Sequence, residues 1–413
     1  MKKKNFSIFL IVFFTGFIIG DLESKKIINY FKNLKNDKIN IDNTIKKEPL
    51  LINQKIIKAN SYDLLVENFI NIEIFTEDLP EYVLRTAGFQ IKKVEEEYDY
   101  RVFLQDGSLI TSNSKSKLNL PNSIDYELNG GLKSVFTFNR KDYGVISNKK
   151  LGCSYISLVD LSNNNILLES ECLPYDEDPD FNGSGGAYIF FKDNLYLSIG
   201  TPSWMDGEKI NMLAQDDSSI FGKILKISLS GLSLSENYNL TYQIFSKGHR
   251  NPQGLVEFEN KLFSTEHGPQ GGDELNIVIE NQNYGWPIKS FGTRYGDGES
   301  YKDQKSGLNL VDPIYSFIPA VAPSSLGICP QNLANYYSDN TCLLSLSLRD
   351  NSIFVILLNK LNNTVQSIEK INLNKRMRHF GTNVEGKVFF DDNFFFITTD
   401  TLEILKIKFL NFR

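Results

Sequence analysis

Short apolar runs separated by turn residues dominate the chain after residue 100. Each run is four to eight residues long, rich in β-branched and aromatic residues, and bounded by Gly, Asn, Asp or Ser. Runs of this length and spacing predict an all-β fold. The runs are Ser134–Phe138, Ser154–Leu161, Ala187–Phe191, Leu195–Gly200, Lys223–Ser228, Leu240–Phe245, Leu262–Glu266, Leu275–Glu280, Thr341–Leu348, Ser352–Leu358, Val388–Asp391, Phe394–Thr398 and Leu402–Phe409.

One sequence shape recurs among these runs. It reads Leu-Tyr-Leu-Ser-Ile-Gly from Leu195, Leu-Phe-Ser-Thr-Glu from Leu262 and Phe-Phe-Ile-Thr-Thr-Asp from Phe395, so the copies begin 67 and 133 residues apart. A repeat of roughly 60 residues over about 350 residues gives about six four-stranded blades, which predicts a six-bladed β-propeller. A β-sandwich with a similar number of strands is the alternative on this evidence.

The N-terminal segment has the composition of a targeting sequence. Lys2, Lys3 and Lys4 precede an apolar run from Phe6 to Gly20, which is shorter than the roughly 20 residues that span a bilayer. We therefore expect residues 1–20 to be a signal peptide or an apolar helix that anchors the chain to the membrane. Residues 21–60 would be a polar tether and residues 61–413 the propeller, located on the periplasmic or extracellular side.

The net charge indicates which partners are excluded, and the cysteine content indicates the redox compartment. The net charge of −6 and a pI near 5.4 argue against a nucleic-acid partner, which would require a cationic face. The four cysteines suit an oxidising compartment, and pairing of Cys153 with Cys172 and of Cys329 with Cys342 is the simplest of three connectivities. Four buried free thiols are the alternative.

Three Gly-rich motifs form the densest chemical signal. They are Gly-His-Arg-Asn-Pro-Gln-Gly-Leu from Gly248, Glu-His-Gly-Pro-Gln-Gly-Gly-Asp-Glu-Leu-Asn from Glu266, and Asn-Tyr-Gly-Trp-Pro from Asn283. Turns of this kind let backbone carbonyls approach a hard cation such as Ca²⁺, and an arginine beside an amide suits an anionic ligand. The alternative is a set of structural turns in which Arg250 pairs with Asp273 or Glu274.

In this order and at this spacing, the three motifs resemble the signature of the glucose/sorbosone dehydrogenase family. Further segments are similar to the family from about Gly130 to Asp400, and the similarity fades before Gly130. These segments are Gly130–Leu132, Pro313–Ser316, Pro319–Ser324, Ser347–Asp350 and Arg376–Arg378.

The resemblance implies a pyrroloquinoline quinone (PQQ) at the centre of the propeller, with a calcium ion bridging cofactor and protein. The carbonyls of Gly268 and Pro269 would bind this calcium, while Asp273, Glu274 and Tyr284 resemble a second, structural calcium site. The residues implied to contact the cofactor are Arg250, Asn251, Gln253, Arg349, Arg376 and Arg378. Of these, Arg349 stands where the family has a lysine, which keeps the charge and changes the geometry.

The chain departs from the family before the run at Leu195. Sugar-oxidising members resemble His-x-Gly/Ser-Gly-Arg at this place, with the His as general base, whereas this chain has Asn182 and Gly186 at the His and Arg positions. An amide is no base near neutral pH, and losing a positioned base typically costs roughly 10²–10⁴-fold in rate. His379, Asp178 and Asp180 are candidate replacements.

Two functions of different classes follow. The first is PQQ- and calcium-dependent oxidation of aldose sugars or related alcohols with an altered or impaired base, using an electron acceptor that the sequence does not identify. The second is a non-catalytic propeller that binds a ligand or a protein. A calcium-dependent hydrolase such as a lactonase ranks below both, because the motifs offer carbonyls and arginines in place of several acidic side chains.

Overall fold

The structure is a computed structural model that describes residues 50–52, 70–78, 85–203, 208–234, 239–301 and 307–412. The expected signal peptide or anchor and nearly all of the expected tether lie outside these residues. Within them, no helix is both long and apolar enough to cross a membrane. The chain divides into two units, Met1–Glu48 and Pro49–Arg413, and only the second is described below.

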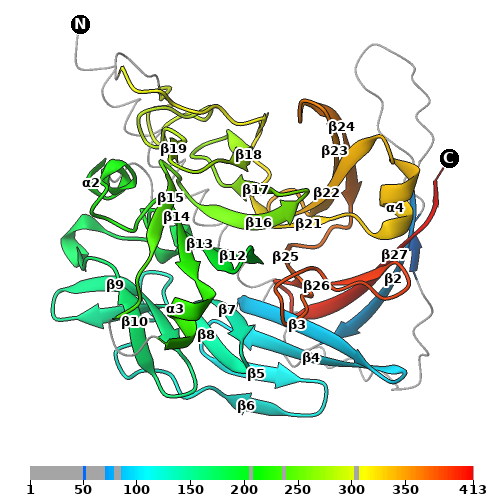
Figure 1. Cartoon of the computed structure of the whole chain (residues 1–413), viewed down its shortest axis with the longest axis horizontal. Coiled ribbons are helices and arrows are strands. Elements are labelled where there is room, and N and C mark those ends of the chain that lie inside the picture. The colour runs from blue at the N-terminus through cyan, green and yellow to red at the C-terminus, as the bar shows by residue number, and fades with distance from the viewer. Residues whose placement is uncertain are drawn as a thin grey trace, which may run out of the picture. The chain divides into compact units, whose positions relative to one another are not determined.

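Six sheets, here called blades 1 to 6, make up this unit (Figure 1). Blade 1 contains β3 (Thr86–Val94), β4 (Glu97–Leu104), β5 (Ser108–Thr111) and β6 (Lys115–Lys117). Blade 2 contains β7 (Leu132–Phe138), β8 (Lys141–Lys150), β9 (Cys153–Asp160), β10 (Asn165–Glu169) and β11 (Leu173–Pro174). Blade 3 contains β12 (Gly185–Phe191), β13 (Asn194–Ile199), β14 (Lys223–Ser228), β15 (Gln243–Lys247) and β19 (Gln282–Asn283).

The remaining blades continue in chain order until the last one, which also takes in the first described strands. Blade 4 contains β16 (Pro252–Phe258), β17 (Lys261–Glu266), β18 (Asp273–Val278) and β20 (Tyr315–Phe317). Blade 5 contains β21 (Pro323–Ile328), β22 (Asn340–Ser347), β23 (Ser352–Asn359) and β24 (Val365–Asn372). Blade 6 contains β25 (Met377–Phe380), β26 (Phe394–Thr399), β27 (Glu403–Phe412), β2 (Ile70–Asp78) and β1 (Leu50–Ile52).

The first strands of the blades form a closed ring. β3 contacts β7, β7 contacts β12, and the series continues through β16, β21 and β25 back to β3. Blade 6 joins both ends of the described chain, because the nine-residue strand β2 pairs antiparallel with β27 at eight positions. This closure confirms the six-bladed propeller over the sandwich. The recurring sequence shape forms the second strand of three blades, β13, β17 and β26.

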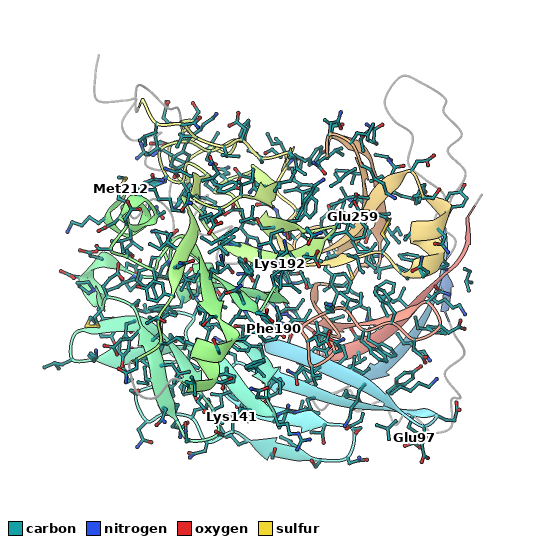
Figure 2. The ribbon with its side chains drawn as sticks, viewed as in Figure 1. Glu97, Lys141, Phe190, Lys192, Met212 and Glu259 are labelled. Atoms are coloured by element: carbon teal, nitrogen blue, oxygen red, sulfur yellow. A yellow bond between two sulfur atoms is a disulfide. The ribbon has the colours of Figure 1, made fainter. Side chains whose placement is uncertain are left out.

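Six hydrophobic clusters lie between the six pairs of adjacent blades. Between blades 3 and 4, for example, Ile224 and Phe245 pack with Leu255 and Val278. Side chains fill the space between the sheets (Figure 2). Burial of one such side chain contributes roughly 1.5–3 kcal/mol, so the ring is held together at every interface.

Some local expectations change. Val388–Asp391, expected as a strand, makes only isolated bridges to Thr382 and Phe394, because it lies in the connection between β25 and β26. β1 comes from the segment expected to be tether and pairs with β2. Short helices α2 (Glu208–Met212), α3 (Leu229–Leu234) and α4 (Gln331–Tyr336) lie in connections.

The disulfide pairing follows the sequence-local expectation. Cys153 is bonded to Cys172 and Cys329 to Cys342, which leaves no free cysteine. The first bond fixes the start of β9, and the second fixes the segment before α4 against β22. The alternative of four free thiols is therefore wrong.

The first strand of every blade has the same irregularity. The pairing register shifts between Thr86 and Gly88 in β3, and a shift occurs at the corresponding start of each other first strand. These shifts follow Leu132 in β7, Gly185 in β12, Pro252 in β16, Pro323 in β21 and Met377 in β25. A bulge of this kind re-aims a side chain. It sets the geometry of the site.

Candidate functional site

A cavity of about 290 Å³ lies where the first strands of the blades begin. All six blades contribute to its wall, because in an up-and-down propeller the first strands all start on one face. Three bulge residues, Lys133 of blade 2, Gln253 of blade 4 and Arg378 of blade 6, occupy equivalent places in their strands and line this cavity.

The cavity brings together most of the residues singled out from the sequence. Asp180 and His379 also line it, whereas Asp178, Glu274 and Tyr284 are not part of its wall. The predicted residues that do line it are Asn182, Arg250, Asn251, Gln253, Gly268, Pro269, Asp273, Arg349, Arg376 and Arg378.

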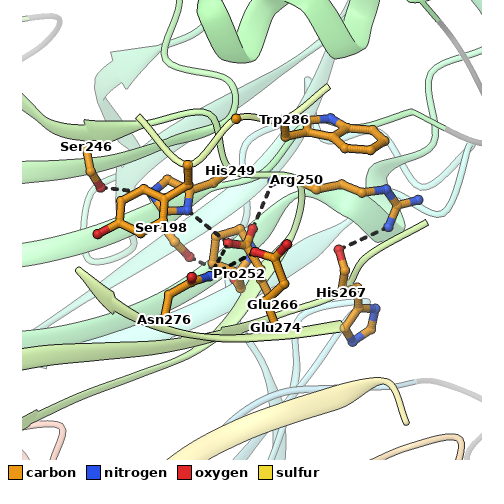
Figure 3. Close-up of polar contacts among 12 residues, drawn as sticks. Ser198, Ser246, His249, Arg250, Pro252, Glu266, His267, Glu274, Asn276 and Trp286 are labelled. Atoms are coloured by element: carbon orange, nitrogen blue, oxygen red, sulfur yellow. Dashed lines mark hydrogen bonds and ion pairs between the residues drawn. The ribbon is translucent and has the colours of Figure 1, made fainter. Parts of the chain in front are cut away.

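Arg250 is held at the start of β16 by contacts from three directions (Figure 3). Its backbone N–H donates to Glu266 Oε2 at 2.9 Å, and its Nη1 donates to the carbonyl of Gly268 at 2.6 Å. The guanidinium lies 5.3 Å from the ring centre of Trp286. Among the described residues it forms no ion pair with Asp273 or Glu274, so the alternative of a structural ion pair there is wrong.

A buried network supports Arg250 from behind. The side chain of His249 is fully buried, with Nδ1 3.1 Å from Glu266 Oε1 and Nε2 2.8 Å from Ser246 Oγ. Asn276 Nδ2 donates to the same Glu266 oxygen at 2.9 Å. These contacts fix the carboxylate that holds the Arg250 backbone, and they give His249 a structural role (Figure 3).

The loop from Asp180 to Gly185 carries Asn182, which the sequence resemblance aligns with a general base. Asp180 Oδ1 accepts from the backbone N–H of Asn182 at 3.0 Å. Asn251 Oδ1 accepts from Gly185 N at 3.0 Å, and Gln253 Nε2 donates to the Gly185 carbonyl, also at 3.0 Å. The two amides predicted to contact the cofactor therefore also hold this loop against blade 4.

Arg85 and Lys133 are two cavity residues that the sequence analysis missed. Arg85 Nη1 donates to Asn182 Oδ1, and burial together with the nearby Arg378 lowers the pKa of Arg85. Lys133 Nζ donates to the Asn129 carbonyl at 2.6 Å. Arg85 lies before the family-like segment and comes next to Asn182 only when the ring closes. Lys133 directly follows the family-like Gly130–Leu132, but no motif residue marks it as part of the site.

Arg376 and Arg378 share the carboxylate of Asp400. Arg376 Nε lies 3.1 Å and Arg378 Nη2 2.8 Å from Asp400 Oδ2. Burial works to raise the pKa of Asp400, but the hydrogen bond and charge of Arg378 hold it below its ordinary value. In the part of the chain that the structure describes, the Arg349 side chain makes no hydrogen bond or ion pair, and it is exposed. The cavity thus has an excess of positive charge.

Asp273, Glu274 and Tyr284 have separate partners. Asp273 accepts backbone N–H groups of Gly268 at 2.9 Å, Val321 at 2.7 Å and Ala322 at 2.6 Å. Burial and the neighbouring Glu266 raise the pKa of Glu274 well above its ordinary value. The Tyr284 hydroxyl donates to the Ile277 carbonyl. Across the described ranges no three His, Cys, Asp or Glu side chains lie close enough to share a metal ion.

Two histidines face the cavity in neutral form. His267 Nε2 lies 2.8 Å from the Pro323 carbonyl and His379 Nε2 lies 3.0 Å from the Thr86 carbonyl, so each Nε2 carries the proton and donates. Burial, followed by the charge of Arg378, lowers the pKa of His379 to about 4. Burial also lowers the pKa of His267.

The fold and the site together define a six-bladed propeller with a central, arginine-lined cavity. The sequence profile described as Glucose / Sorbosone dehydrogenase matches residues 103–393, and the chain belongs to this family.

Curated relatives match over parts of their length. The chain is 32% identical over 208 residues to an uncharacterized protein of Synechocystis, covering 48% of this chain and 50% of the relative. It is 34% identical over 122 residues to the aldose sugar dehydrogenase YliI of Escherichia coli, covering 28% and 31%. It is 35% identical over 99 residues to quinoprotein glucose dehydrogenase B of Acinetobacter calcoaceticus, covering 23% and 20%. The chain thus spans half or less of the curated relatives it matches.

Solved structures show the same fold. The apo-form of the soluble aldose sugar dehydrogenase from Escherichia coli superposes with a TM-score of 0.61 at 21% identity, covering 81% of this chain and 99% of that chain. The PQQ-bound form of the aldose sugar dehydrogenase from Streptomyces coelicolor gives 0.53 at 18% identity, covering 82% and 98%.

Proposed function

We propose that this chain is a PQQ-dependent dehydrogenase of aldose sugars or related alcohols, with calcium as a second cofactor and with an altered catalytic base. One observation carries the proposal: Arg250, Arg349, Arg376 and Arg378 converge on one cavity. A protein scaffold alone does not require four guanidinium groups around an opening. Membership of the family and the names of the relatives support the same reading.

The cavity residues fit the charge and shape of PQQ, a planar ortho-quinone with three carboxylates. Arg376 and Arg378 share one protein carboxylate and so retain one excess positive charge. Arg349 has no partner among the described residues and Arg250 binds only carbonyls through its side chain. Arginine binds carboxylates in bidentate geometry, so these side chains would hold the cofactor, which supplies the hydride acceptor when bound.

The chain's own residues also orient the site. Trp286 and the Glu266–His249 network fix Arg250, so its guanidinium needs little ordering when a ligand binds. Asn251 and Gln253 fix the loop of Asn182. Asn182 has no ionisable group and cannot take the substrate's hydroxyl proton at neutral pH.

The proposed calcium ion would be bound by backbone carbonyl oxygens at the cavity wall. The Gly268 carbonyl accepts from Arg250 at 2.6 Å and the Pro269 carbonyl from Tyr295 at 3.1 Å. A carbonyl has a second lone pair, so both could still bind Ca²⁺ at the cavity wall. Asp273 orients Gly268 by accepting its N–H. We do not extend the proposal to a second calcium at Asp273, Glu274 and Tyr284, because their side chains have separate partners.

The second candidate is a non-catalytic binding propeller. It is favoured by Asn182 and by Gly186, whose φ of +99° is a backbone conformation that an arginine side chain would strain. The periplasmic or extracellular location and the N-terminal signal or anchor also belong to the proposal. Cell fractionation with protease accessibility of the expressed full chain tests both.

The testing experiment titrates the purified full chain with PQQ in millimolar Ca²⁺ and follows the cofactor's absorbance. A panel of aldoses with a dye acceptor then measures turnover, and a chelator tests calcium. Binding with dye reduction is the expected result. Binding without reduction of dye by any aldose would favour the binding propeller, and absence of PQQ binding would overturn the proposed function.

A further inference from the structure

An oxidation of this kind needs a group that takes the substrate's hydroxyl proton, and Asn182 cannot. The inference below rests on the proposed function. Five ionisable groups that could in principle accept a proton line the cavity: Asp180, His267, Asp273, His379 and Lys133. His267 donates to the Pro323 carbonyl, and Asp273 accepts three backbone N–H groups, so Asp180, His379 and Lys133 remain as candidates. The surroundings of each decide which is suited to the task.

Asp180 and His379 each form hydrogen bonds that stabilise the surrounding structure. Asp180 Oδ1 accepts from Asn129 Nδ2 at 2.9 Å and from Asn182 N at 3.0 Å, which caps the short 3-10 helix Phe181–Gly183. His379 Nε2 donates to the Thr86 carbonyl, and its pKa, lowered by burial to about 4, makes the remaining nitrogen a weak base at neutral pH.

Lys133 is placed differently. It is the bulge residue of β7, equivalent to Gln253 in β16 and Arg378 in β25, and it lines both the main cavity and a smaller adjoining one. Its Nζ donates to the Asn129 carbonyl at 2.6 Å, and Asn129 in turn donates to Asp180. The amine is thus tethered by one hydrogen bond to the network that carries Asn182, and a neutral amine keeps one lone pair free.

Burial and the neighbouring charges lower the pKa of Lys133, so that its neutral form is populated near neutral pH. Burial and the Arg85 guanidinium of blade 1 lower the pKa of Lys133 to about 7, with a further decrease from Arg378 of blade 6 and an opposing increase from Asp180 of blade 3. A general base works best when its pKa is near the operating pH. Arg85 therefore has a positioning role, because it holds Asn182 and disfavours a second cation beside it.

We propose that Lys133 is the general base of this chain, in place of the histidine that the family resemblance implies at the position of Asn182. The substrate's O–H bond breaks and its proton moves to the neutral Nζ. The cofactor, when bound, would supply the acceptor for the hydrogen and the electron pair of the substrate's C–H bond, and the substrate would become a carbonyl compound. Lys133 would hold the other proton as an ammonium ion.

A first test needs no turnover. Competitive acetylation with acetic anhydride, read by mass spectrometry from pH 5 to pH 11, reports the titration of each lysine. The acetylation of Lys133 is expected to have its midpoint near pH 7. Lys141, an exposed lysine in the same blade that pairs with Asp160, is expected to have an alkaline midpoint. Arg85→Gln should move the Lys133 midpoint upward. A Lys133 midpoint near 10 in the wild type would overturn the proposal.

A second test uses the PQQ-loaded protein. Lys133→Met should lower kcat by about 10²–10⁴-fold, the range for removal of a positioned base, with PQQ affinity within about threefold. Lys141→Met is the matched control and should keep the wild-type rate. Added alkylamines should partly restore the turnover rate of Lys133→Ala and should not raise the rate of the wild type.

The outcomes separate the two proposals. Two results would overturn the role of Lys133 without affecting the proposed dehydrogenase function. The first is an equal rate for the wild type and Lys133→Met. The second is that the acidic limb of the kcat/KM profile is lost in Asp180→Asn or in His379→Asn. Absence of dye reduction by wild type would overturn the dehydrogenase, and with it any base.

Discussion

His379 shows how burial and a neighbouring charge tune one residue of the cavity wall. Its pKa is lowered from an ordinary 6.5 to about 4, chiefly by burial and then by Arg378. The folded state therefore binds a proton less readily than the unfolded state. The free energy of unfolding is therefore unaffected by this group above about pH 6.5, and it decreases as the pH falls from there through 4.

The predicted consequence is an acid-sensitive fold. Between pH 7 and pH 4 the wild type should lose up to about 3 kcal/mol more unfolding free energy than His379→Gln, which does not titrate. Urea denaturation at a series of pH values measures this. Parallel pH profiles for the two proteins would contradict the assigned role of His379.

Glu266 gives a second prediction at the residue scale. Glu266→Gln keeps the size of the side chain but replaces one carboxylate oxygen by an amide N–H₂ group. In one orientation this group faces the backbone N–H of Arg250, and in the other it faces His249 and Asn276. Leaving a buried donor without an acceptor costs about 1–3 kcal/mol. Urea denaturation should show this loss, and PQQ titration should show weaker binding.

The matched control is Glu259→Gln, an exposed residue in the turn between β16 and β17 (Figure 2). It should leave both stability and PQQ affinity unchanged. A Glu266→Gln protein as stable as this control would mean that the buried network does not support Arg250.

At the scale of elements, local sequence patterns predicted strands well and connections less well. The second strands β13, β17 and β26 could be found because their apolar runs recur with common punctuation. Val388–Asp391 has the same apolar character, but no neighbouring strand is available to it. Hydrogen-bond partners across a sheet are not encoded in a run of residues.

The same limit explains what was missed in the site. Arg250, Arg349, Arg376 and Arg378 lie in segments that resemble the family, so their roles could be inferred one by one. Arg85 lies 97 residues before Asn182, and their contact exists only because blades 1 and 3 face one opening. The bulge that directs Lys133 inward is likewise a feature of strand pairing.

The disulfide of Cys329 and Cys342 gives a prediction for blade 5. It closes a separation of 13 residues between β21 and β22, the connection that contains α4. Replacement of both cysteines by serine should cost about 2–4 kcal/mol of unfolding free energy. Urea denaturation in oxidising buffer measures the loss, and a change below about 0.5 kcal/mol would show that the connection is held by packing alone.

At the scale of the whole molecule, ring closure and the cavity depend on each other. Strands from both ends of the described chain complete blade 6, and this blade supplies Arg376 and Arg378. A ligand that contacts several blades should therefore stabilise the ring as a unit. PQQ at 100 times its Kd is expected to raise the unfolding free energy by about 2.7 kcal/mol, measured as an increase in Tm. An unchanged Tm at saturation would contradict a site in the folded cavity.

The most direct test of the central claim is the PQQ affinity of Arg349→Ala. Because Arg349 is exposed and has no partner among the described residues, its removal should leave the Tm of the ligand-free protein unchanged. The account predicts at least about tenfold weaker PQQ binding, the equivalent of about 1.4 kcal/mol, for Arg349→Ala. It predicts wild-type affinity for Arg294→Ala, which removes an exposed arginine outside the cavity wall. Equal affinity in all three proteins would contradict an arginine-bound cofactor in this cavity.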